Sequence, residues 1–106
     1  MFNTLPVFIT GNQNKADYLS RQLGVKLDHQ KIDLLELQST DLHEIVAHKL
    51  KQAYETVQKP VLVEDVSLVF NALGDLPGPY IKWFVDHAGD VACCKMLDGF
   101  DDRSAI

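Results

Sequence analysis

The sequence lacks the features that mark several common protein classes. Its two cysteines are adjacent, Cys93 and Cys94, and neighbours on a helix point about 100° apart, which excludes a disulfide framework or a metal-knuckle spacing. We interpret them as small buried residues in a reducing compartment. No apolar run approaches the roughly 20 residues of a membrane span. No basic segment opens a secretory signal, so we expect a cytoplasmic protein without membrane contact.

Positive charge is also scarce, because ten Lys and Arg residues stand against fifteen Asp and Glu residues and give a formal charge of −5. This balance disfavours binding to nucleic acid, and an anionic small ligand would need local cations or a metal ion. Hydrophobic residues make up 46% of the 106 positions and charged residues 24%, which excludes a disordered chain. With no repeats or linkers, we expect no internal domain boundary.

The first third of the chain predicts the start of an α/β domain. Residues 5–10 (LPVFIT) form a short apolar run, typical of a strand buried on both faces. A polar turn follows, then a helical pattern that ends with Gly24 as a C-cap. Residues 25–34 alternate imperfectly and predict a second strand. This order of strand, loop, helix and strand is characteristic of α/β proteins.

The clearest predicted helix begins at a capping box formed by Asp41 and Glu44. Apolar residues, Leu50 and Tyr54 among them, then recur with helical periodicity as far as Val57. The remaining expected elements are a buried strand over 61–63, an extended segment over 67–73, a turn-rich loop over 74–79, a helix that begins at Pro79 and a helix over 90–97.

One candidate binding segment lies between the first strand and the first helix. It consists of Thr10, Gly11, Asn12, Gln13, Asn14 and Lys15. Amide groups at a helix start attract anions, and glycine lets a phosphate approach the backbone, so the segment is a candidate phosphate cradle. The Walker spacing is absent. The alternative is an ordinary turn with Asn14 as the N-cap.

Acidic residues form a second candidate site. Glu64 and Asp65 follow the strand over 61–63, and ligands of open α/β sheets tend to bind beyond the carboxyl ends of strands. With Glu36 they could hold Mg²⁺, and a carboxylate there could activate a water molecule. The alternative is a polar strand end with solvated acids. The four histidines have no metal-binding spacing.

The segment over 74–84 combines two glycines, two prolines and an aromatic helix start. We expect the loop to face a substrate, with Lys82 directed toward a phosphate, while Trp83 and Phe84 pack in the core. Lys49 lies on the polar side of its predicted helix, where a solvated charge is the simplest interpretation.

Together these segments resemble the inosine triphosphate pyrophosphatase family. The resemblance rests on Thr10-Gly11-Asn12 with Lys15, on Leu62-Val63-Glu64-Asp65, and on residues 70–84 (FNALGDLPGPYIKWF), which are close to eukaryotic members. Residues 31–38 also fit the family's second strand. The similarity covers essentially the whole chain in the right order.

The resemblance implies an α/β fold with a mixed central sheet flanked by helices, in two lobes with a cleft between them. Residues 1–106 would be the N-terminal portion of a single domain of this kind. It further implies hydrolysis of non-standard purine nucleoside triphosphates (ITP, dITP, XTP) to monophosphate and pyrophosphate. Mg²⁺ would be the cofactor, with Mn²⁺ as an alternative, and members are usually homodimers.

The same resemblance implies roles for individual residues. Residues 10–15 would wrap the triphosphate, and Lys49 and Lys82 would neutralise its charge, which revises the interpretation of Lys49. Asp65 would also contact the substrate and act as the base for the attacking water. The implied metal ligands are carboxylates: Glu36, Glu64 and Asp65.

Two departures from the family pattern stand out. Val66 replaces a threonine and removes its hydroxyl. The family's C-terminal half, which holds the base-recognition residues, is absent, and residues 101–106 end as a strand begins. We therefore expect a truncated form. Besides the enzyme, the alternatives are a catalytically impaired fragment that binds a nucleotide or a partner, and a plain phosphate-binding module.

Overall fold

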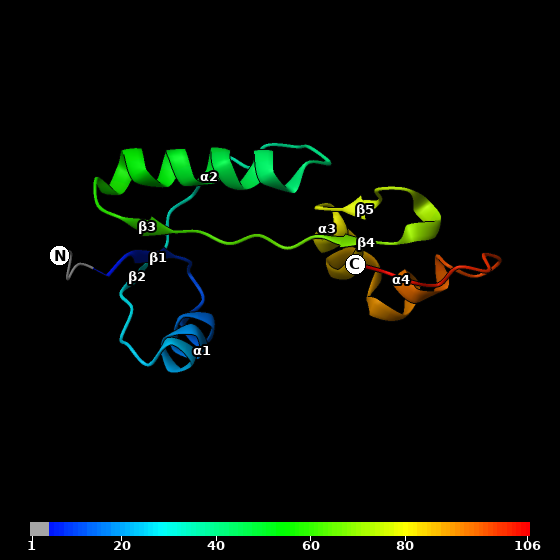
Figure 1. Ribbon diagram of the computed structural model, residues 1–106, viewed down its shortest axis with the longest axis horizontal. Helices are drawn as coiled ribbons and strands as arrows, with labels where there is room; N and C mark the ends of the chain where they lie inside the picture. Colours follow the sequence, from blue (N-terminus) through cyan, green and yellow to red (C-terminus); the bar gives the residue numbers. More distant parts are fainter. Residues whose placement is uncertain (1–4) are drawn as a thin grey trace. The chain divides into compact units, whose positions relative to one another are not determined.

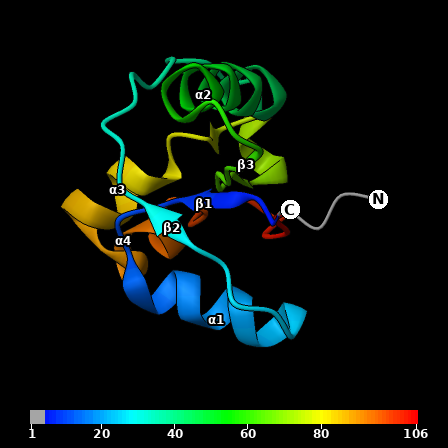
Figure 2. The same ribbon diagram turned by 90° about the vertical axis from the view of Figure 1, so that its left-hand side faces the viewer.

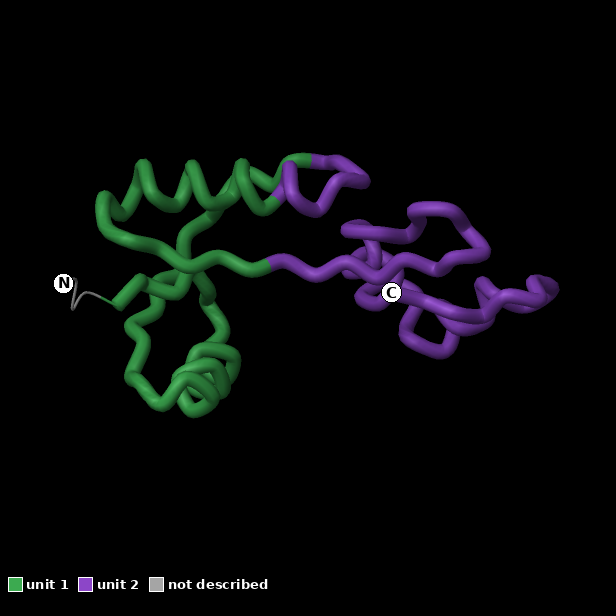
Figure 3. The backbone as a smooth tube through the Cα atoms, in the orientation of Figure 1, with its two compact units in different colours: residues 1–37, 46–64 green, residues 38–45, 65–106 purple. Residues whose placement is uncertain are grey.

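The computed structural model describes residues 5–106, and the chain divides into two compact units (Figure 3). Unit 1 contains the residues up to Leu37 together with Val46–Glu64, and unit 2 contains Gln38–Ile45 and Asp65–Ile106. Within the described range, none of the helices has both the length and the apolar character that a membrane crossing needs. The assignment of the chain to one portion of a larger domain stays a prediction.

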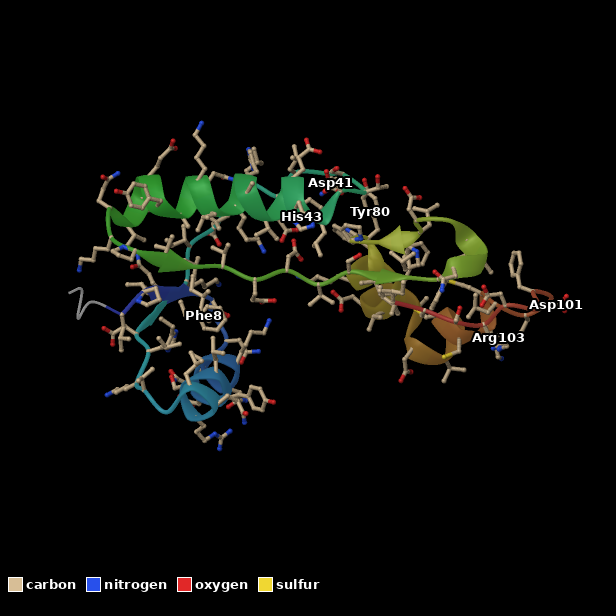
Figure 4. The ribbon with its side chains drawn as sticks, viewed as in Figure 1. Phe8, Asp41, His43, Tyr80, Asp101 and Arg103 are labelled. Atoms are coloured by element: carbon tan, nitrogen blue, oxygen red, sulfur yellow. The ribbon has the colours of Figure 1, made fainter. Side chains whose placement is uncertain are left out.

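Unit 1 is built on a parallel sheet of three short strands. Strand β1 (Val7–Ile9) lies between β2 (His29–Gln30) and β3 (Val61–Leu62) and pairs with both. Phe8 lies at the middle of β1, where Figure 4 labels it. Its exposed fraction is only 2%. A central strand that is buried in this way explains why the run over 5–10 is apolar without alternation.

Two helices flank this sheet. Helix α1 (Gln13–Leu23) covers one face, and α2 (Leu42–Val57) lies on the other (Figures 1 and 2). The predicted α/β class is therefore confirmed. The C-cap of α1 is Gly24, as expected, with a left-handed φ of 69°. Its N-cap is Asn12, whose side chain accepts the amide of Lys15, so the alternative cap at Asn14 was wrong.

The start of α2 modifies the predicted capping box. Oδ1 of Asp41 accepts the amide of His43 at 2.9 Å, as an N-cap should (Figure 4). The reciprocal bond runs through a third residue: the Asp41 amide donates to Ser39 Oγ, which donates to Glu44 Oε2. The expected apolar stripe on α2 is only partly buried: Tyr54, one of its members, is 52% exposed.

Unit 2 contains an antiparallel pair, β4 (Leu68–Val69) and β5 (Pro77–Gly78), joined through the 3₁₀ turn η1 (Asn71–Leu73). The peptide bond before Pro77 is cis. The chain end lies along the other edge of β4, where the amide of Val69 donates to the carbonyl of Ile106 at 2.8 Å and the reverse bond measures 2.9 Å. The expected entry into a strand at 101–106 takes the form of an isolated antiparallel bridge between Phe70 and Ala105. Parallel and antiparallel pairs occupy separate sheets.

Helices α3 (Ile81–Ala88) and α4 (Asp90–Lys95) complete unit 2 (Figure 1). The core residues of this unit are Phe70, Ile81, Cys93 and Leu97. Trp83 and Phe84 were expected in the core, but they are 57% and 38% exposed. Trp83 lies two residues after Ile81, about 200° around the helix, and therefore points away from that core. Of the two cysteines, only Cys93 is buried.

Two boundaries differ from the sequence expectations. The strand expected over 25–34 shrinks to β2, because the amide of Leu27 donates to Ser20 Oγ of α1 and ties this segment to the helix. Helix α3 begins two residues later than Pro79, since the amide of Tyr80 closes a turn onto the carbonyl of Pro77.

Candidate functional site

The loop after β1 is held by its own side chains. Oγ1 of Thr10 accepts the amide of Asn12 at 3.1 Å, and Oδ1 of Asn12 accepts the amide of Lys15 at 3.1 Å. The amides of Gln13 and Asn14 fall in the first turn of α1, where a helix offers no backbone acceptor. These amides and the positive end of the helix dipole favour an anion at this place.

A pocket of about 260 Å³ opens beside this loop. Its lining consists of Ile9, Thr10, Gly11, Ile32, Asp33, Leu34, Glu36 and Lys49. Four residues that the sequence singled out therefore meet in one place. A Cβ at position 11 would stand 3.0 Å from the side chain of Lys31, so a larger residue there would require this lysine side chain to shift. Asp33 was missed, although its place between two apolar residues was a usable signal.

Two lysines converge on the end of β3. Nζ of Lys15 lies 2.6 Å from Oε1 of Glu64, and Nζ of Lys49 donates to the Glu64 carbonyl at 3.0 Å. The side chains of the ion pair are 44% and 40% exposed, so the pair contributes only about 0–1 kcal/mol to folding stability. Its main effect is to hold one cation from α1 near a second from α2.

The other predicted site residues make separate contacts. Gln13 bonds to His29 and Asp17, and Asn14 is exposed. Asp65 belongs to unit 2, where its Oδ1 accepts the amide of Val66 at 2.8 Å. Lys82 lies exposed on α3. Unit 1 thus holds the loop, Lys49 and two of the three predicted metal ligands.

The carboxylates are arranged differently from a ready-made metal site. Within residues 5–106, no three His, Cys, Asp or Glu side chains gather closely enough to hold an ion together. Mg²⁺, however, is commonly bound by one or two carboxylates and by the phosphates of a substrate. Glu36 at the pocket and Glu64 at the end of β3 fit this second arrangement through their hard oxygen donors.

Comparisons with known proteins show what the chain is similar to. A protein of Pyricularia oryzae named inosine triphosphate pyrophosphatase is 47% identical over 92% of this chain and 52% of its own length. A protein of the same name from Phaeosphaeria nodorum is 45% identical over 92% of the chain and 53% of its own length. Inosine triphosphate pyrophosphatase 2 of Trypanosoma cruzi is 44% identical over 92% and 50%.

The chain therefore spans about half the length of the curated relatives it matches. The model of the Ham1 family matches residues 6–106. Because this match covers nearly every residue, the chain belongs to the Ham1 family, and the resemblance to inosine triphosphate pyrophosphatases that the motifs predicted is confirmed.

Proposed function

We propose that the protein hydrolyses non-standard purine nucleoside triphosphates (ITP, dITP and XTP) to the monophosphate and pyrophosphate, with Mg²⁺ or Mn²⁺ as cofactor. The observation that carries this proposal is the pocket lined by Thr10, Gly11, Glu36 and Lys49, next to the capped start of α1. A polyphosphate needs amide donors and cations, and a metal ion needs carboxylates. The names of the relatives supply the nucleotide class.

In the proposed reaction, water hydrolyses the phosphoanhydride between the α- and β-phosphates. The P–O bond between them breaks, and the monophosphate and pyrophosphate are released. The loop over 10–15 wraps the phosphates, while Lys15, Lys49 and Lys82 balance their charge. Asp65 contacts the substrate and accepts a proton from the attacking water. Glu36, Glu64 and Asp65 are the proposed oxygen ligands of Mg²⁺, which when bound would withdraw charge from the phosphate oxygens.

The proposal is tested by pyrophosphate release from ITP and from ATP, with and without Mg²⁺. We expect release from ITP that requires Mg²⁺ and falls at least about 100-fold in Asp65→Asn, the range that loss of a general base removes. Asp98→Asn is the matched control, because the side chain of Asp98 is exposed and forms an ion pair with Arg103, outside the predicted site. Circular dichroism of each variant verifies folding.

A second candidate function rests on the capped start of α1 and the two lysines at the end of β3, which suit phosphate binding without catalysis. On this alternative, the protein is a catalytically impaired member that binds a nucleotide or a partner. ITP binding in calorimetry without pyrophosphate release would support it. Failure of the folded chain to bind or hydrolyse ITP would rule out the nucleotide-based proposals.

We also propose that the protein is cytoplasmic and assembles as a homodimer. The free state of Cys93 and Cys94 is consistent with a reducing compartment. The dimer rests on the family resemblance alone. Light scattering after size-exclusion chromatography would reveal twice the monomer mass of 11.9 kDa if the dimer forms.

A further inference from the structure

His29 of β2 contacts the candidate phosphate-binding loop (residues 10–15) at two points. Nε2 of His29 lies 2.8 Å from Oε1 of Gln13, and Nδ1 of the same ring lies 3.4 Å from the carbonyl oxygen of Thr10. Gln13 is also bonded through Nε2 to Oδ1 of Asp17 at 2.8 Å. One imidazole therefore contacts both the beginning of the loop and the first residue of α1.

The chemistry of these partners fixes the protons on the ring. A carboxylate only accepts hydrogen bonds, so Asp17 requires the NH₂ group of Gln13 to face it, which leaves Oε1 of Gln13 facing His29. Nε2 of His29 must then carry a proton. The carbonyl of Thr10 is also an acceptor, so Nδ1 needs a proton as well. Only the imidazolium form donates to both partners.

Charged residues of both signs line the same pocket as His29. His29 shares a pocket with Asp17 and Arg21 of α1 and with Lys26 and Asp28 of the segment before β2. Strand β1 (VFI) contributes no titratable side chain. Beyond β2, the side chain of Lys31 lies against Gly11. The formal charges of these four residues sum to zero, so they favour neither form of the ring through their net charge. The two hydrogen-bond acceptors, the Thr10 carbonyl and Gln13 Oε1, are therefore the groups that favour the protonated ring.

We infer that His29 is a positioning residue, whose protonation draws the Thr10 carbonyl and Gln13 together and fixes the loop over 10–14 for a triphosphate. The inference rests on the proposed function for the identity of the ligand. A histidine changes charge between about pH 5 and about pH 8. The imidazolium ring donates to both acceptors, whereas the neutral ring has a proton for only one of the two contacts.

The first experiment needs no ligand. NMR follows the amide signals of residues 10–14 and the histidine ring signals from about pH 5 to about pH 8. We expect the loop amides to move with the same midpoint as His29, and to lose this movement in His29→Gln. His43→Gln is the matched control, because His43 is an exposed residue of α2 outside the loop.

Asp17→Asn provides a second variant that keeps the histidine. It allows the Gln13 amide to turn over, which removes the requirement for two protons, so the loop amides should no longer follow His29. The inference is overturned if the loop amides ignore the midpoint of His29 in the unmodified chain. It is equally overturned if they still titrate in His29→Gln.

The second experiment measures ITP affinity by calorimetry near pH 6 and near pH 8. The phosphates of ITP titrate too, so the informative quantity is the difference between the unmodified chain and His29→Gln. We expect the unmodified chain to lose about five-fold more affinity at high pH, the lower end of typical coupling. Equal losses contradict the inference. Absence of ITP binding contradicts the proposed function, while the NMR result still decides the role of His29.

Discussion

At the scale of single residues, substitution of Lys15, which pairs with Glu64, should affect ligand binding much more than folding stability. Their carboxylate–ammonium contact is exposed, so Lys15→Ala should change the free energy of unfolding by less than about 1 kcal/mol. The same change removes a cation from the proposed phosphate site, where a hydrogen bond to a charged group contributes about 1.5–3 kcal/mol. Urea unfolding and ITP calorimetry together check both expectations.

The expected loss of ITP affinity is therefore about ten-fold or more, with nearly unchanged stability. Lys51→Ala is the matched control, because Lys51 is an exposed lysine of α2 outside the pocket. A variant that binds ITP normally would remove Lys15 from the site. A large drop in stability would instead show that the pair acts as a structural contact.

Several residues of the candidate site could be predicted because their chemistry is local. Thr10, Gly11 and Lys15 lie in one loop, whose sequence is typical of a strand-to-helix anion site. The pairing of Lys15 with Glu64 could not be predicted, since 49 positions separate them along the chain. His29 was missed for the same reason, because its contacts with the loop depend on how β2 pairs with β1.

At the scale of elements, the N-cap of α1 can be tested by comparing Asn12 with Asn14. The side chain of Asn12 accepts the amide of Lys15, whereas Asn14 is an exposed residue inside the helix. Asn12→Ala should lower the free energy of unfolding by about 0.5–2 kcal/mol. Asn14→Ala should change it by less than about 0.5 kcal/mol. Urea unfolding of both variants measures the difference.

Because Asn12 also shapes the loop, its alanine variant should weaken ITP binding, while Asn14→Ala keeps the loop bonds between Thr10 and Asn12 intact. Equal destabilisation by the two substitutions would contradict the assigned cap. A larger loss of stability in Asn14→Ala would favour the cap at Asn14 that the sequence had left open.

Helices could be located from the sequence better than strands, and the reason is physical. Caps and apolar periodicity act within a few residues, so the ends of α1 and α2 are close to the expected ones. Strands need partners from elsewhere in the chain. The segment over 25–34 alternates like a strand, yet the Ser20 hydroxyl binds the amide of Leu27 and only β2 joins the sheet.

At the scale of the whole molecule, each unit has its own sheet and its own buried aromatic residue. Phe8 is 2% exposed in the parallel sheet of unit 1, and Phe70 is 5% exposed in the core of unit 2. Two units could not be predicted from the sequence, because both have an ordinary composition and no low-complexity segment separates them. Contacts within each unit, which the sequence does not display, define the division.

Replacement of each phenylalanine by alanine should therefore have a local consequence. Either change leaves a cavity that costs about 3–5 kcal/mol of stability, and the opening should be confined to the unit that loses the side chain. Hydrogen exchange read by mass spectrometry should show faster exchange for β1 and β3 in Phe8→Ala, and for β4 and α4 in Phe70→Ala. If both variants accelerate exchange in the same peptides, the two units open together as one cooperative structure.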